Sequence, residues 1–201
     1  MKKLKSSLVN IFMSLTVICL VAGAALAAAN KYTATAIEMS KVAALSAAVK
    51  RVAPEFDNDP VADKYFAGAD SLTVYPALKD GQTVGYAVET FDKNGFSGMI
   101  RIMVGFDASG KLLNYSVLEH NETPGLGSKM QEWFSSDAGR RSVLGRDMTG
   151  NALTVTKDGG DVDAITAATI SSRAFLRAIN LAYAAISGGG ADGTSGATTK
   201  Q

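Results

Sequence analysis

The stretch from Val84 to Val117, VGYAVETFDKNGFSGMIRIMVGFDASGKLLNYSV, decides the fold of this chain. Apolar residues recur at every second position in the runs 84–88, 100–104 and 113–117, a spacing typical of β-strands with one buried face. Turn sequences rich in Asp, Asn and Gly separate the runs. Because strands joined by short turns pair with their neighbours, the stretch predicts an antiparallel sheet in meander order.

The flanking segments complete the predicted domain. A further strand is expected at 72–75, a short helix at 128–134, another strand at 152–156 and a final amphipathic helix at 169–187. We therefore expect an α+β fold in which one twisted antiparallel sheet is flanked by helices. This domain spans 71–187, and the Gly, Ala, Ser and Thr residues of 188–201 predict a flexible tail.

The N-terminus predicts export of the domain. Three lysines lie among the first five residues, and an almost uncharged stretch from Leu8 to Ala29 follows them. A bilayer-spanning helix needs roughly 20 apolar residues, so 1–30 is predicted to be a single membrane anchor whose lysines stay in the cytoplasm. The sequence Ala25-Leu26-Ala27 also suits a cleaved signal peptide. The residues leave both alternatives open.

The segment 31–70 is predicted to be a membrane-proximal helical segment. Its apolar residues from Thr33 to Val52 have helical spacing, and Pro54 ends the pattern.

Composition excludes several classes of function. The chain has 20 Lys and Arg against 19 Asp and Glu, so no nucleic-acid partner is indicated. Cys19 is the only cysteine and lies in the apolar N-terminal run. A disulfide framework, an iron–sulfur cluster and a cysteine zinc site are therefore excluded within one chain. We expect neither a catalytic residue nor a metal site.

The segment Asp163-Ala164-Ile165-Thr166-Ala167-Ala168-Thr169 brings a hydroxyl group to the start of the final helix. A threonine at this position is commonly an N-cap, and that interpretation stays open. Two alanines remove bulk just before the hydroxyl, and a short turn could bring the Asp163 carboxylate near it. No catalytic base is evident, so the pattern favours a threonine that is modified over one that catalyses.

A helix N-terminus would suit a phosphate ester on Thr169. The backbone N–H groups of Ile170, Ser171 and Ser172 are predicted to be free to bind the anion. The hydroxyl groups of the two serines could add donors.

A second segment, His120-Asn121-Glu122-Thr123-Pro124-Gly125-Leu126-Gly127-Ser128-Lys129, follows the fourth predicted strand. Its proline and glycines predict a stiff turn whose backbone a flat ligand can approach closely, and Lys129 could supply positive charge near an anion. A plain strand-to-helix connector is the alternative.

The first of these segments resembles the flavinylation motif of FMN-binding domains. In that motif Asp is followed by two free positions, Ser or Thr, Gly or Ala, Ala, and the acceptor Thr. The continuation at 170–174 is similar to that of the G subunit of Rnf electron-transport complexes. The resemblance implies that a flavin transferase, using FAD and Mg²⁺, joins FMN covalently to Thr169 through a phosphoester. Ala167 departs from the commoner Gly and leaves the acceptor intact.

The Glu122–Lys129 segment is similar to the loop that packs on the flavin in this family. The resemblance therefore implies that FMN is bound by residues of both segments: Asp163, Thr166, Ala168, Thr169, Ile170, Ser171, Glu122, Thr123, Gly125, Leu126, Gly127 and Lys129.

The resemblance also implies a function. It predicts a flavoprotein subunit that relays electrons in a membrane-bound, ion-translocating ferredoxin:NAD oxidoreductase, with other membrane and peripheral subunits as partners. The location implied is a bacterial inner membrane, with the domain on the periplasmic side. Two alternatives stay open: an exported or anchored binding module without redox activity, and the related C subunit of a sodium-pumping NADH:quinone reductase.

A near-copy of the acceptor segment, Asp192 to Thr198, lies in the tail. It has Gly196 at the commoner Gly position but no helix after it that could hold a phosphate. Thr169 is therefore the expected principal site, and Thr198 a possible second FMN site.

Overall fold

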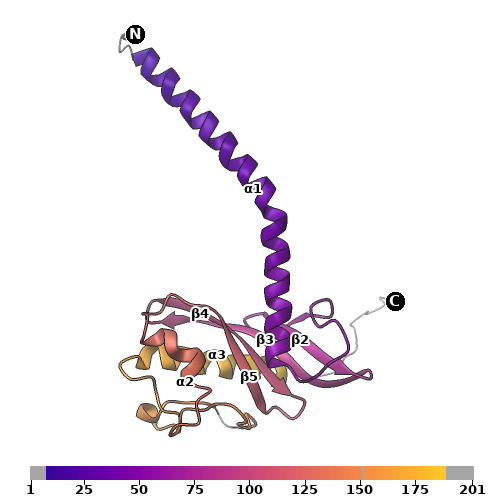
Figure 1. The fold of residues 1–201 in the computed structure, drawn as a ribbon. Helices are drawn as coiled ribbons and strands as arrows, with labels where there is room; N and C mark the ends of the chain where they lie inside the picture. The colour runs from indigo at the N-terminus through magenta and orange to yellow at the C-terminus, as the bar shows by residue number, and fades with distance from the viewer. Residues whose placement is uncertain (1–7, 151, 189–201) are drawn as a thin grey trace, which may run out of the picture. The chain divides into compact units, whose positions relative to one another are not determined.

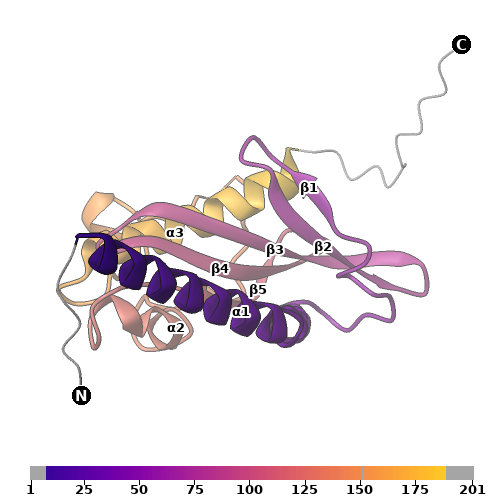
Figure 2. The ribbon, with the colours of Figure 1, turned by 90° about the horizontal axis from the view of Figure 1, so that it is seen from above.

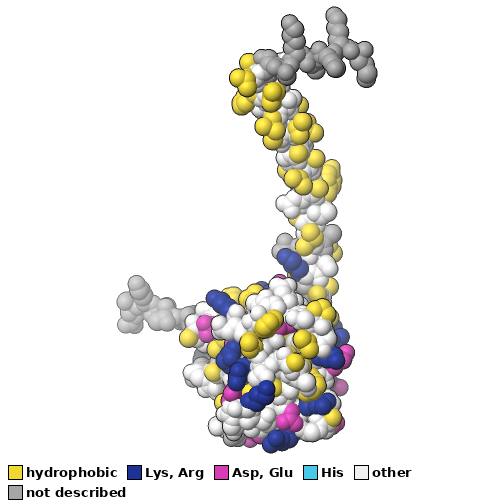
Figure 3. Space-filling model, turned by 90° about the vertical axis from the view of Figure 1, so that its left-hand side faces the viewer, with side chains coloured by type: hydrophobic (Ala, Val, Ile, Leu, Met, Phe, Trp, Pro, Cys, Tyr) yellow, Lys and Arg dark blue, Asp and Glu magenta, His cyan; other side chains and the backbone are white. Residues whose placement is uncertain are grey.

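The computed structural model describes residues 8–150 and 152–188, and the chain divides into two units at Leu45 and Ser46. Helix α1 (Leu8–Val52) makes up the described part of the first unit, and its last residues belong to the second. Its N-terminal part exposes hydrophobic side chains, whereas charged side chains of both signs are scattered over the face of the domain that Figure 3 shows. By length and composition α1 can cross a membrane, a property that it shares with signal sequences near an N-terminus.

The second unit is an α+β domain built on one open antiparallel sheet (Figures 1 and 2). Its strands follow chain order: β1 (Tyr65–Ala67), β2 (Leu72–Lys79), β3 (Gln82–Gly95), β4 (Gly98–Asp107) and β5 (Leu112–Glu119). The predicted meander of four strands is confirmed as β2 to β5. The short and largely exposed β1 was missed, because three residues carry no periodic signal.

Helix α3 (Thr169–Ser187) covers one face of the sheet and packs on β3 and β4 (Figure 2). The core between them is apolar, and the buried Thr90 hydroxyl donates to the carbonyl oxygen of Ala178 at 2.9 Å. An ion pair between Asp92 and Arg177 joins β3 to α3 at the surface. The helix bounds agree with the sequence prediction because a strong amphipathic pattern and the Gly at 188 delimit it.

The last turn of α1 covers the opposite face. Side chains alternate along a strand, and Val104 and Phe106 belong to the core under α3, so Gly105 between them faces the other way. A Cβ at Gly105 would collide with the backbone of Val52. The absence of a side chain there lets α1 end directly on β4. The helical part of the predicted 31–70 segment therefore stops at Val52, and β1 occupies part of the remainder.

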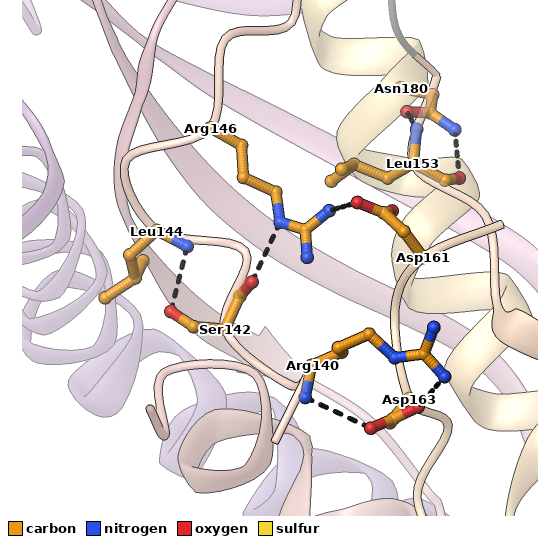
Figure 4. A network of polar contacts seen from close by, with 8 residues as sticks. All are labelled: Arg140, Ser142, Leu144, Arg146, Leu153, Asp161, Asp163 and Asn180. Atoms are coloured by element: carbon orange, nitrogen blue, oxygen red, sulfur yellow. Dashed lines mark hydrogen bonds and ion pairs between the residues drawn. The ribbon is translucent and has the colours of Figure 1, made fainter. Parts of the chain in front are cut away.

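The strand expected at 152–156 is wrong. Val155 forms only an isolated parallel bridge with Val162. The backbone of Leu153 bonds instead to the side chain of Asn180 on α3, with its N–H 2.8 Å from Oδ1 and its carbonyl oxygen 2.9 Å from Nδ2 (Figure 4). The apolar side chains are buried as the pattern indicated, but a helix side chain takes the place of a neighbouring strand.

The remaining predictions differ in detail. The short helix at 128–134 is a 3₁₀ turn, η1 (Gly127–Lys129), followed by α2 (Met130–Trp133). The predicted tail, apart from Gly188, lies outside the described residues, as do the lysines of the first five positions.

Candidate functional site

Thr169 is the first residue of α3 and not its N-cap. Ala168 occupies the cap position with φ −133°, and no side chain caps the helix. Helical hydrogen bonding begins one residue earlier than expected, because the Ala168 carbonyl oxygen already accepts the N–H of Ser172 at 3.0 Å. The predicted cap was therefore wrong. The Thr169 hydroxyl oxygen instead accepts a hydrogen bond from Lys157 Nζ at 3.2 Å.

The start of α3 presents two of the three predicted anion-binding donors. The N–H of Ser172 is used within the helix, whereas within 8–150 and 152–188 those of Ile170 and Ser171 have no protein acceptor. Both serine hydroxyls also have protein partners. Ser171 Oγ donates to Glu122 Oε2 at 2.6 Å, and Ser172 Oγ donates to the Ala168 carbonyl oxygen at 2.9 Å. The expectation of two free hydroxyl donors is not met.

A cavity of about 280 Å³ opens beside Thr169. It joins the two segments that the sequence singled out, and most of the predicted binding residues line it: Glu122, Thr123, Leu126, Gly127, Ala168, Thr169, Ile170 and Ser171. Segments about 40 positions apart in the chain thus form one site.

Two lining residues, Phe96 and Ala167, were not among the predicted binding residues. Phe96 lies on the turn between β3 and β4 and is 66% exposed, and Ile170 is 48% exposed. With Leu126 they give the cavity an apolar rim. An exposed aromatic residue on a hairpin is a usable sequence signal, although nothing local in the sequence links it to 122–129 or 167–171.

The two glycines of the loop have different roles. A Cβ at Gly127 would lie 2.5 Å from Ser171 Oγ and 2.7 Å from Glu122 Oε2, so this position must be glycine for the loop to reach α3. Gly125 has φ +76° and open space around it, so it serves the turn and does not line the cavity.

Thr169 also borders a second depression, of about 410 Å³. Asp163 and Thr166 line it together with Trp133, Arg141 and Lys157. The Arg141 guanidinium lies 3.9 Å from the Trp133 ring centroid, and the indole N–H donates to the Asp163 carbonyl oxygen at 2.8 Å. This depression therefore has an aromatic and cationic wall, unlike the apolar cavity.

The Asp163 carboxylate points to Arg140, whose N–H lies 3.1 Å from Oδ2 and whose guanidinium lies 3.6 Å from Oδ1 (Figure 4). The same view shows Arg146 paired with Asp161 and donating to the Ser142 carbonyl oxygen at 2.9 Å. These contacts fasten the long connection between α2 and α3. The aspartate of the acceptor segment thus holds the backbone that carries Thr169.

The cation nearest the Thr169 hydroxyl is Lys157, which the sequence analysis missed. It lies in η2 (Thr156–Asp158), and a bidentate ion pair between Asp158 and Arg173, at 2.7 and 2.6 Å, fastens η2 to the first turns of α3. Hydrogen bonds from Arg173 hold the pKa of Asp158 below its usual value. Lys129, the predicted cation, is exposed and lines neither depression.

Comparisons with known proteins show which family this chain resembles. Residues 95–184, which contain both segments, match the FMN-binding domain family. The chain is 35% identical over 147 residues to the G subunit of the ion-translocating oxidoreductase complex of Vibrio vulnificus, covering 67% of this chain and 68% of the relative. The G subunits of the same complex are 36% identical over 165 residues in Yersinia pestis, with 76% and 78% covered, and 30% identical over 192 residues in Shewanella piezotolerans, with 89% of each covered.

Proposed function

Because this chain belongs to the family of G subunits of ion-translocating oxidoreductase complexes, we propose that it carries FMN esterified to Thr169 and relays electrons within such a complex. The observation that carries the proposal is the position of the Thr169 hydroxyl. It lies at the rim of an apolar cavity, beside Lys157 and the first N–H groups of α3.

The residues of the cavity suit a flavin. Ligand pockets usually measure about 300–1,000 Å³, and about 280 Å³ suits the flat ring system better than a complete FMN molecule. The apolar rim of Phe96, Leu126 and Ile170 offers contact to the ring, and Gly127 lets the loop approach α3 so that both segments wall one cavity. When bound, FMN supplies the one- and two-electron redox chemistry of its isoalloxazine ring.

The residues around Thr169 suit a phosphodiester. A phosphate on Oγ1 would have the N–H groups of Ile170 and Ser171 at the positive end of α3, and the Lys157 ammonium on the other side. The two backbone N–H groups and the Lys157 ammonium would thus together stabilise the single negative charge of the phosphodiester. These groups would also restrict rotation about the ester and keep the ring near the cavity.

The proposed attachment is a phosphoryl transfer from FAD. Thr169 Oγ1 attacks the phosphorus of the FMN half, and an Oγ1–P bond forms as the bond from that phosphorus to the bridging pyrophosphate oxygen breaks. AMP leaves with the bridging oxygen, and the hydroxyl proton passes to a base of the flavin transferase. Lys157 donates to Oγ1 and does not accept, so it leaves this hydroxyl proton free to depart.

We further propose that α1 is retained as an anchor and that the domain lies on the periplasmic side of a bacterial inner membrane. The apolar length of α1 and the lysines that precede it support this orientation. An anchor would keep the cofactor close to the neighbouring membrane and peripheral subunits with which it exchanges electrons.

The test is covalent flavin on the full chain. Co-expression with a flavin transferase, followed by denaturing electrophoresis, should show in-gel flavin fluorescence. Its absence would favour a binding module without redox activity. Intact mass of Thr169→Ala should show no FMN adduct, apart from any on Thr198, whereas Thr198→Ala should keep it. An adduct retained in Thr169→Ala but absent in Thr198→Ala would make the tail the principal site.

A further inference from the structure

Glu122 is the only charged side chain that is buried in the described residues, with 4% of its surface exposed. It lines the cavity beside Thr169. Buried carboxylates are rare unless a cation or several donors compensate them. Its partners therefore reveal what this charge does to the cavity.

In the described part of the chain, the two donors to the Glu122 carboxylate are both neutral. The backbone N–H of Ser97 lies 3.0 Å from Oε1, and the Ser171 hydroxyl lies 2.6 Å from Oε2. Each carboxylate oxygen thus accepts one hydrogen bond. Within the described chain no Lys or Arg forms an ion pair with Glu122. The hydrogen bonds stabilise the charge without cancelling it.

The Glu122 carboxylate lies among three parts of the domain: the turn between β3 and β4, helix α3, and the loop that carries Glu122 itself. Ser97 lies on the turn between β3 and β4, and Ser171 lies on α3. A Cβ at Gly95 would lie 2.6 Å from Oε1, and one at Gly127 would lie 2.7 Å from Oε2. Two glycines thus make the space that Glu122 fills. Each carboxylate oxygen is therefore held by one hydrogen bond and by close packing against one glycine.

We propose that Glu122 sets the reduction potential of the bound flavin by holding its carboxylate against the ring. This role rests on the proposed function. Adding an electron to a ring beside an uncompensated carboxylate is electrostatically unfavourable, and the apolar, partly enclosed cavity screens the repulsion less than water does. The charge therefore lowers the potential and makes the reduced flavin a stronger donor. Lys157 contacts Thr169 Oγ1, where the phosphate would be, so it leaves the carboxylate uncompensated.

Glu122→Gln tests the charge at nearly constant shape. The amide oxygen can accept from Ser97 N–H, and the amide N–H₂ can donate to Ser171 Oγ. Spectroelectrochemical titration of the flavinylated full chain should show a higher midpoint potential than that of the wild type. Glu132→Gln, which removes an exposed carboxylate of α2 outside the cavity, should leave the potential unchanged.

Ser171→Ala tests the same charge from the donor side. It keeps the carboxylate and removes one hydrogen bond that disperses its charge, so the potential should fall or stay the same. If Glu122 had a purely structural role, the midpoint potential would shift in the same direction in Glu122→Gln and in Ser171→Ala. If Glu122→Gln does not fold, a midpoint potential of Ser171→Ala above that of the wild type overturns the role of Glu122, and a lower one supports it.

The outcomes separate the two proposals. Covalent flavin on wild-type Thr169, with an unchanged or lower potential in Glu122→Gln, would overturn the role of Glu122 and leave the proposed function intact. A potential that rises in Ser171→Ala as much as in Glu122→Gln would overturn it too. A wild-type chain without flavin would remove the proposed function and this role together.

Discussion

Lys157 Nζ donates a hydrogen bond to Thr169 Oγ1 at 3.2 Å, across 12 positions of the chain. The contact exists because the Asp158–Arg173 ion pair holds η2 against the start of α3. The Thr169 hydroxyl thus has its oxygen bonded to a cation, and within the described part of the chain it donates to no protein acceptor. This arrangement differs from an N-cap, in which the threonine oxygen would face the helix N–H groups.

Replacing Lys157 should slow the loading of FMN. An exposed charge contact contributes up to about 1 kcal/mol, so Lys157→Gln should lower the initial rate of flavinylation by about threefold to fivefold. Lys157→Arg should restore most of the rate, since it keeps the charge. The rate is measured by intact mass over time with purified transferase and FAD.

Lys129→Gln is the matched control for that experiment, because it removes an exposed lysine that lines neither depression. Its flavinylation rate should equal that of the wild type. If Lys129→Gln is slowed and Lys157→Gln is not, the loop supplies the cation, as the sequence pattern indicated.

Gly127→Ala should disrupt the site. Its Cβ would lie 2.5 Å from Ser171 Oγ and 2.7 Å from Glu122 Oε2, and overpacking of this kind costs about 1–3 kcal/mol. Chemical denaturation should show the loss, together with reduced flavin content. Gly125→Ala meets open space at φ +76°, so it should cost about 1 kcal/mol from backbone strain and leave the flavin content unchanged.

Lowering the pH should weaken the ion pair between Asp92 and Arg177, which links β3 to α3. Burial would raise the pKa of Asp92, but hydrogen bonds from Arg177 and from the backbone N–H of Asn94 outweigh it and hold the pKa below 3.8. A carboxyl whose folded pKa is lowered stabilises the fold above its unfolded pKa, and this stabilisation disappears as the pH falls through the folded value.

The free energy of unfolding of Asp92→Asn should accordingly be about 1 kcal/mol lower at pH 7 and should depend less on pH below about 4. Urea titrations of the two proteins across this pH range, at constant ionic strength, provide the comparison. Parallel pH profiles for wild type and variant would show that the ion pair adds nothing to stability.

Asn180→Ala should loosen the segment that the sequence predicted as a strand. It would leave the backbone N–H and carbonyl oxygen of Leu153 without their partners, at a cost of about 1–3 kcal/mol. Asn180→Asp keeps an acceptor for the N–H but turns a carboxylate oxygen towards the carbonyl oxygen, so it separates the two hydrogen bonds. Hydrogen exchange at the Leu153 amide provides the local measurement: it should accelerate in Asn180→Ala and much less in Asn180→Asp.

Local patterns predicted most of the fold. The strands β2 to β5 follow from alternation between turn signals, and α3 follows from its amphipathic stripe and the residues at its ends. The strand predicted at 152–156 was wrong for a physical reason. In 152–156 the apolar spacing correctly indicated burial, but burial alone does not say which group takes the backbone hydrogen bonds, and Asn180 takes them.

For the candidate site too, the sequence predicted some features and only the tertiary structure decided others. By itself the sequence indicated Thr169 as the proposed acceptor and predicted the glycine-containing loop, because a modification motif and a tight turn are contiguous in the chain. Only the tertiary structure decided that Lys157, and not Lys129, contacts Thr169, and that Ser171 binds Glu122 rather than facing a ligand freely. Hydrogen bonds and charge contacts act over a few ångströms in space. Which distant segments come within that reach depends on how the whole sheet and α3 pack, and no local pattern encodes it.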